Sequence, residues 1–342
     1  NIVTGVPISN PIQSYKTTDV SLDVTWRIVK GVSVRGSAGV REWTREERAI
    51  EDSDETTLGA AVILDPLDWL SITGSYSMAQ RDIDDDEYLP ELEAVFLRQF
   101  DQAERDRDTI GLIVQVSAGD HVSIGASYDY LKDEYPDTSF GLIDSKGFNG
   151  AVDVTFSPTA NLTFFAMAGL DSREDQMHSI AKDDASVTGI APGYTQANQW
   201  DSVIDDKVTT LGAGARLSLV SDRLDLEARY NRSLGRTEFD NSNPVKPVKL
   251  VNAVAAEWPD QENDLSDASL KVGWKARPDV TVGVRWTYEN YNLDDFTWER
   301  VKPYSFAETN PTFSESRRFL FLDSTYGDYK GSIVTAFMNY AF

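Results

Sequence analysis

The chain has 342 residues and a formal net charge of −24, with no cysteine and only two histidines, His121 and His178. Without cysteine it cannot form disulfides, thiolate metal sites or a haem attached through a C-x-x-C-H motif, and its acidity argues against nucleic acid as a partner. No run of about 18 apolar residues is present, so we expect no transmembrane helix, while a membrane barrel with alternating strands stays possible.

From Thr17 onward the chain repeats one unit: a strand, a very short turn, a second strand and a long polar segment. Apolar residues occupy every second position of each strand, which is the period of a β-strand with one apolar face. We expect six such hairpins and a terminal strand, thirteen strands in all: 20–28 with 32–40, 58–64 with 70–78, 110–116 with 122–130, 148–156 with 162–170, 211–219 with 224–230, 268–274 with 280–288, and 334–342.

The connections between these strands alternate in length. Every short turn follows an odd-numbered strand, and the long loops follow the even-numbered ones, at 44–55, 81–108, 132–145, 172–207, 233–266 and 290–330. Outer-membrane barrels show this asymmetry, with short periplasmic turns and long outer loops. The sequence therefore predicts an all-β fold, a transmembrane antiparallel up-and-down β-barrel in residues 17–342, with residues 1–16 as an outer loop or an incomplete N-terminal edge.

The two faces of the predicted strands differ in chemistry. We expect the apolar face to contact lipid; it includes Val152, Val154, Leu224, Leu226, Val282 and Val284. The opposite face carries charged and small residues, which suit a wet or protein-lined lumen and would be costly in a sandwich core. The candidates for contact with a partner in the lumen are Asp129, Asp153, Arg216, Arg229, Lys271 and Arg285.

Aromatic residues gather near both ends of the predicted strands, which indicates the interfacial girdles of a membrane barrel. Near the loop ends these residues are Trp43, Tyr76, Tyr130, Tyr230 and Tyr288, and near the turn ends they are Trp26, Phe156, Trp274 and Phe342.

Two loop segments hold weaker signals. In Pro90–Arg107 apolar residues recur at helical spacing, which indicates either a short helix or an irregular loop packed by its own aromatics. The start of the predicted loop 81–108 holds three weak candidates for calcium ligands, Asp82, Asp84 and Asp86. The residue order of an EF-hand is missing there, so a solvated acidic loop fits better. The two histidines have no nearby nucleophile pattern, so we expect no enzymatic activity.

Four stretches resemble the MtrB/PioB family, the large outer-membrane barrels of porin–cytochrome conduits. They are FDQAERDRDTIGL (Phe100–Leu112), YDYLKDEYPDTSFGLIDSKGFNGAVDVTFSP (Tyr128–Pro158), RLDLEARYNRSLGRTEF (Arg223–Phe239) and VTVGVRWTYENYNLDDFTWERV (Val280–Val301). The resemblance implies an integral protein of the bacterial outer membrane, in contact with lipid and lipopolysaccharide. It also implies a multihaem c-type cytochrome inside the barrel and an outer-surface cytochrome on its loops. The haem c would be carried by the partner cytochrome, with no cofactor bound by this chain.

The hairpin repeat by itself also fits a general or substrate-specific diffusion porin, so that alternative stays open. The resemblance further implies more than twenty strands, whereas thirteen are predicted here, and an odd count disagrees with the even count of single-chain bacterial barrels. We therefore expect the chain to be the C-terminal portion of a longer barrel, with the terminal strand pairing elsewhere than with residues 17–29.

Overall fold

The computed structural model describes residues 14–83, 98–180, 199–220, 223–243, 255, 257–295, 304–306, 318–320 and 328–341. Within these residues, thirteen strands form one antiparallel sheet, and β13 (Tyr304–Phe306) pairs with β14 (Arg318–Leu320) in a separate small hairpin. No helix of the described residues is long and apolar enough to cross a membrane. The predicted all-β fold and the thirteen predicted strands are confirmed.

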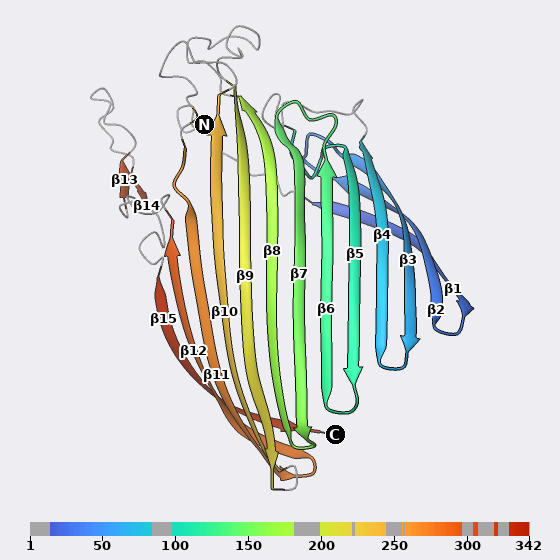
Figure 1. The fold of residues 1–342 in the computed structure, drawn as a ribbon. Coiled ribbons are helices and arrows are strands. Elements are labelled where there is room, and N and C mark those ends of the chain that lie inside the picture. The colour runs from blue at the N-terminus through green and yellow to red at the C-terminus, as the bar shows by residue number, and fades with distance from the viewer. Residues whose placement is uncertain are drawn as a thin grey trace.

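The strands of the large sheet follow one another in chain order, each paired antiparallel to the next. Figure 1 shows the short turns at one end of the sheet and the long connections at the other. The strands are β1 (Tyr15–Val29), β2 (Val32–Arg45), β3 (Asp52–Leu67), β4 (Leu70–Ile83), β5 (Arg105–Ala118), β6 (Val122–Glu134), β7 (Gly141–Thr159), β8 (Leu162–Ile180), β9 (Gln199–Leu219), β10 (Leu224–Ser242), β11 (Gln261–Arg277), β12 (Val280–Asp294) and β15 (Tyr329–Tyr340).

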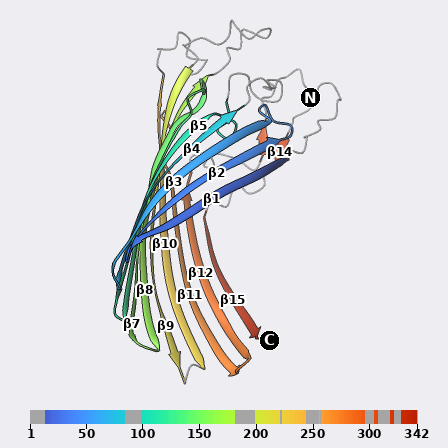
Figure 2. The same ribbon diagram turned by 90° about the vertical axis from the view of Figure 1, so that its right-hand side faces the viewer.

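The sheet is a twisted and curved wall with two free edges. Strand β1 pairs only with β2, and β15 pairs only with β12, so the described strands do not close on themselves. Figure 2, turned by 90°, shows β1–β4 tilted across the central strands, which is the coiling expected of a large twisted sheet. The expectation that the terminal strand does not pair with residues 17–29 agrees with this order.

Apolar residues form a band across one face, on the half of the sheet nearest the short turns. On β8 this face runs through Leu162, Phe164, Ala166, Ala168 and Leu170, and then changes to Ser172, Glu174 and Gln176. The apolar part suits the length of about 9–11 residues with which a tilted strand crosses the hydrocarbon layer. We call this part of the sheet the apolar band.

The strands extend beyond the apolar band and into the segments predicted as long loops. The predicted loop 172–207 is shortened to 181–198, and the predicted loop 233–266 is shortened to 243–260; the other four shorten in the same sense. The reason is that charged pairs continue the ladder where apolar alternation stops, as in Arg232–Asp264 and Lys146–Glu174, both at 2.8 Å. Strands β7–β10 thereby reach 19 to 21 residues.

The helix predicted within Pro90–Arg107 falls partly outside the described residues, which resume at Arg98. From there the chain forms an isolated bridge between Arg98 and Gly141, then a turn, and β5 begins at Arg105. Residues 98–104 therefore agree with the alternative of an irregular loop, residues 105–107 belong to β5, and the alternative of a helix is wrong for residues 98–107. Backbone pairing to β4 and β7 takes precedence here over the helical spacing of the apolar residues.

Candidate functional site: the polar face of the sheet

The six charged residues predicted to face the lumen share one face of the sheet. Directly opposed residues of an antiparallel pair lie on the same face, and the register pairs Arg216 with Glu227, Glu227 with Lys271, and Lys271 with Arg285. Continuing the alternation through β8 and β7 to β6 places the remaining three on this face as well: Arg229, Asp153 and Asp129. We call this surface the polar face.

The polar face is the more crowded side of the sheet. A Cβ atom built at Gly111 or Gly125 would fall within 3 Å of a neighbouring carboxylate oxygen, whereas one at Gly36 or Gly74 on the apolar side meets nothing within 4 Å. Side chains converge on the concave side of a curved sheet and spread apart on the convex side. The crowding therefore indicates that the polar face is concave, as the lumen side of a barrel wall must be.

Large side chains on the polar face lie flat against the backbone of neighbouring strands. A Cβ at Gly214 would lie 2.3 Å from the ring of Phe165, and a Cβ at Gly283 would lie 2.4 Å from the ring of Phe337. The carboxylate of Asp153 covers Gly125 in the same way. Each glycine thus leaves the space that a bulky neighbour fills, which keeps the polar face shallow rather than studded with projecting rings.

Cationic side chains gather on β9–β12. The carboxylate of Glu227 accepts hydrogen bonds from both Arg216 and Arg229, at 2.7 and 2.5 Å. The guanidinium of Arg229 lies 5.5 Å from the Phe165 ring centre, and Lys271 Nζ lies 5.3 Å from that of Phe337. An open hollow of about 400 Å³ over β7–β10 is lined by Thr155, Thr163, Phe165, Met167, Gly212, Ala213, Arg216, Arg229 and Asn231.

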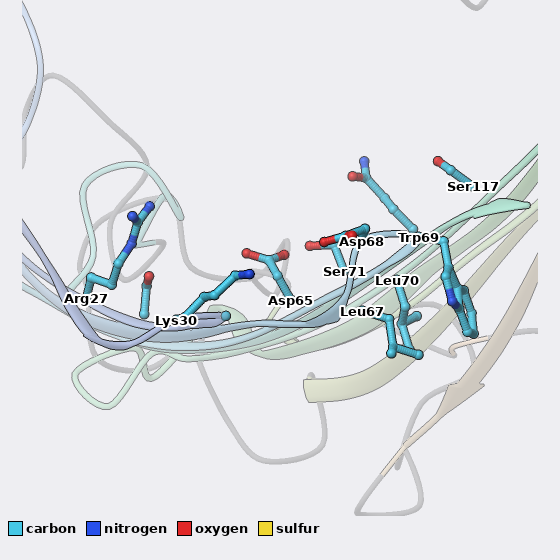
Figure 3. Close-up of a pocket in the computed structure, with 12 residues that line it drawn as sticks. Arg27, Lys30, Asp65, Leu67, Asp68, Trp69, Leu70, Ser71 and Ser117 are labelled. Atoms are coloured by element: carbon cyan, nitrogen blue, oxygen red, sulfur yellow. The ribbon is translucent and has the colours of Figure 1, made fainter. Parts of the chain in front are cut away.

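A second open hollow of about 530 Å³ lies at the turn end of β1–β5. Figure 3 shows Arg27, Asp65 and Ser71 on one side of the sheet there, with the apolar side chains of Leu67 and Leu70 pointing to the other. The amide of Asp65 donates to the Gly31 carbonyl at 2.7 Å, so neighbouring turns are joined directly. The hollow is formed by the turn ends of neighbouring strands. Its cationic and acidic side chains, such as Arg27 and Asp65, do not converge on one point.

At the outer end of the sheet, residues 46–51, 98–104 and 135–140 fold onto the polar face of β2–β7; we call these three segments the ledge. Of the three largest fully buried side chains among the described residues, Ile50 and Gln102 lie in the ledge and Ser145 lies on β7. Gln102 Oε1 accepts a hydrogen bond from the amide of Ile50 at 2.8 Å. Arg45 and Arg81, which lie on the polar face, donate to the carbonyls of Asp101 and Ala103 at 2.9 and 2.8 Å.

A close backbone contact anchors the ledge to the wall, next to a buried ion pair between two wall strands. Arg107 of β5 and the buried Asp133 of β6 form a two-bond pair at 2.6 and 2.7 Å. Burial raises the pKa of the Tyr135 phenol, so this group stays neutral at physiological pH. Gly141 has a φ of 125°, and a Cβ there would lie 2.5 Å from the Arg98 carbonyl oxygen, so this approach requires glycine. These contacts leave no periodic signal in the sequence.

The apolar face carries exposed side chains where lipid contact was predicted, with exposed fractions of 47% at Val152 and 48% at Val284. The other four predicted lipid-facing residues lie on the same face by register. So do seven of the predicted girdle aromatics: Trp26, Tyr76, Tyr130, Phe156, Tyr230, Trp274 and Tyr288. Trp43 is an exception, because it lies on the polar face, 5.5 Å from the ring of Tyr15 and 5.4 Å from the guanidinium of Arg45. Phe342 lies outside the described residues.

The weak calcium candidates are not brought together in the described part of the chain. Asp82 lies near the end of β4, and Asp84 and Asp86 lie outside the described residues. Among described residues no group of three or more histidine, cysteine, aspartate or glutamate side chains could hold a metal ion. His121 lies in the β5–β6 turn, and His178 pairs with Asp201 at the outer end of β8.

Comparison with known proteins shows to which family this chain belongs. A family model for outer membrane beta-barrel porins, MtrB/PioB, matches residues 1–342. The chain belongs to the MtrB/PioB family. Its resemblance to that family in the four stretches quoted above is confirmed, and the sheet is the wall of an outer-membrane β-barrel.

One curated relative with a sequence similar to this MtrB/PioB chain is outer membrane protein MtrB of Shewanella baltica (strain OS185). The two are 24% identical over 297 residues, which cover 85% of this chain and 39% of that protein. The chain thus spans about two fifths of its relative's length.

Solved structures that align with this chain include two receptors. The ferric-catecholate import receptor Fiu of E. coli K12, in its closed form, aligns with a TM-score of 0.49 and 10% identity, covering 82% of this chain and 57% of the receptor. The siderophore receptor PiuA of Acinetobacter baumannii aligns with a TM-score of 0.48 and 13% identity, covering 81% and 48%. Similarity at this level says nothing about transport by the MtrB/PioB chain.

Proposed function

We propose that this chain is the wall of an outer-membrane barrel that surrounds and positions a multihaem c-type cytochrome, so that electrons cross the outer membrane through the partner's haems. The observation that carries the proposal is the shallow polar face, on which Phe165 and Phe337 lie flat over glycines. Such a face lets another folded protein approach the wall closely. Small and charged residues also give the approaching protein hydrogen-bond and ion-pair partners.

In this proposal the barrel itself carries no redox group and catalyses no reaction. The chain has no cysteine, and His121 and His178 lie in a turn and at the outer end of β8, so the chain's own residues do not fit a covalently attached haem. The haem c belongs to the partner. The wall contributes a low-dielectric sleeve that separates the partner from lipid and lipopolysaccharide, and its outer loops offer a surface to an outer-surface cytochrome.

A visible absorption spectrum of the complex purified through a tag on this chain tests the proposal. We expect a haem Soret band with cytochrome present in equimolar amount to the barrel protein. A colourless preparation from cells that express the cytochrome would contradict the proposal.

The ledge favours a second candidate, a diffusion porin, because a loop folded onto the lumen face is how porins narrow a channel. The ledge contacts the outer ends of strands β2–β7, beyond the apolar band, through residues such as Arg45 and Arg81. Conductance in planar bilayers separates the two functions. A haem-free preparation that conducts ions steadily supports the porin, and a haem-loaded preparation that does not conduct supports the sheath.

A further inference from the structure

Charge is unevenly distributed over the polar face within the apolar band. One row crosses the sheet directly through Arg216, Glu227, Lys271 and Arg285, on the successive strands β9 to β12. Arg229 and Lys275 lie on the same face, next to this row. We call these five cationic residues the basic wall: Arg216, Arg229, Lys271, Lys275 and Arg285.

Much of this positive charge is uncompensated within the described chain. Glu227 is shared between Arg216 and Arg229, and Asp225 accepts a hydrogen bond from the Ser218 hydroxyl. Among the described residues, Lys271, Lys275 and Arg285 form no ion pair with a carboxylate. They are therefore available to a partner of opposite charge.

The rest of the polar face at the same depth does not repeat this pattern. On β1 and β2 the cations Arg35 and Arg41 are each paired with an aspartate, Asp23 and Asp19, and one further cation, Arg27, lies near the turn. Strands β3 and β4 present neutral residues there, such as Thr57, Thr73 and Ser77. Strands β6 and β7 present Asp129 and Asp153, which also form no ion pair among the described residues. The basic wall is thus one side of a face whose charge is segregated by strand.

We infer that the basic wall is a docking surface for an acidic patch on the protein that occupies the lumen. This inference rests on the proposed function and deepens it by naming where the cytochrome contacts the barrel and with which charge. The occupant is a macromolecule because the cations spread along a row and do not converge. Strands lie about 4.8 Å apart, so Arg216 and Arg285 are separated by about 14 Å, too far for one small anion to bridge.

The wall's position strengthens this attraction. The strands beneath it are flanked by hydrocarbon, so field lines from the lysine and arginine heads are focused into the lumen. Charges of this kind orient an acidic partner and fix its rotation inside the barrel. Their effect falls with salt, because the Debye length shortens from about 10 Å at 0.1 M to about 3 Å at 1 M.

The test uses the full chain co-expressed with its haem-carrying partner, captured on an affinity resin and washed at increasing NaCl. The variant Lys271→Gln/Arg285→Gln removes two positive charges from the basic wall. The matched control Thr73→Glu/Ser77→Glu makes the same change in net charge on the neutral part of the same face. Far-UV circular dichroism and heat-modifiable electrophoretic mobility report whether each variant is folded.

We expect the glutamine variant to retain about tenfold less haem than the wild type, as for the loss of two interfacial charge contacts, and the control to retain the wild-type amount. Wild-type retention should also fall with NaCl. If the glutamine variant does not fold, Lys275→Gln serves instead, with an expected loss of about threefold for one charge.

Three outcomes overturn the inference. If the folded glutamine variant retains as much haem as the wild type, the basic wall is not a docking surface, but the proposed function is unaffected. An equal loss in variant and control shows that net charge matters and this wall does not. A variant that keeps its haem and changes only the anion selectivity of the channel assigns the wall to small anions. If the wild type captures no haem, the proposed function itself fails.

Discussion

Glycine positions on the polar face determine how deeply side chains project into the lumen. At Gly125 an added Cβ would meet only the side chain of Asp153, at 2.3 Å. At Gly283 it would meet the Phe337 ring and the backbone oxygen of Val272, both at 2.4 Å. A flexible carboxylate can move away from a new methyl group, whereas backbone cannot. The two positions therefore differ in what a substitution would cost.

Replacing Gly125 by alanine should force Asp153 off the wall and destabilise the protein by about 1–3 kcal/mol through overpacking. Adding Asp153→Ala should recover much of that loss, which a double-mutant cycle of unfolding free energies measures. Gly74→Ala on the open apolar side is the control and should be neutral or slightly stabilising. Equal costs at the two glycines would contradict the crowding argument.

Val282 and Thr281 test the assignment of the two faces from adjacent positions of β12. Val282→Arg places a charge against lipid two residues from the start of β12 and should destabilise the protein by at most the ~2–4 kcal/mol expected at the bilayer midplane. Thr281→Arg faces the lumen and should not carry that penalty. Gly283 faces the same way but is an unsuitable control, because any side chain there meets backbone. Equal losses of stability in a detergent or lipid folding assay would count against the barrel assignment.

At the scale of elements, the ledge is held by polar contacts that only the folded sheet brings together. Gln102→Ala should leave the buried amide of Ile50 without its acceptor, at a cost of about 1–3 kcal/mol. We expect faster hydrogen exchange at residues 46–51 and 98–104 with unchanged exchange in the apolar band. Gln80→Ala, on the outward face of β4, is the control and should leave exchange in the ledge unchanged. Unchanged exchange in Gln102→Ala would show that this contact does not anchor the ledge.

Strand number, order and the two faces could be predicted from sequence because alternation is strong within the apolar band. The outer parts of β7–β10 could not, since both of their faces are polar and the period-2 signal disappears, as at Lys146 and Glu174. Trp43 was assigned to the wrong face because it lies three positions after Val40, out of phase with the apolar residues of β2. The ledge depends on contacts such as Arg45 to Asp101, between residues far apart in the chain.

At the scale of the whole molecule, the wall separates two environments. Its convex face is apolar over the length of a membrane crossing, and its concave face is polar, shallow and charged by strand. This combination explains how a chain with a mean hydropathy of −0.37 belongs in a membrane. In the function proposed above, the concave face contacts a protein rather than open water.

Single cysteines test that claim directly, because the chain has none of its own. Ser269→Cys lies on the polar face of β11, opposite Arg229 of the basic wall, and its neighbour Leu270→Cys lies on the apolar face. We expect a water-soluble maleimide to label Ser269→Cys in barrels without cytochrome and to leave it unlabelled in barrels that hold cytochrome, while Leu270→Cys in lipid is unlabelled in both. Equal labelling of Ser269→Cys with and without cytochrome would contradict the proposed function.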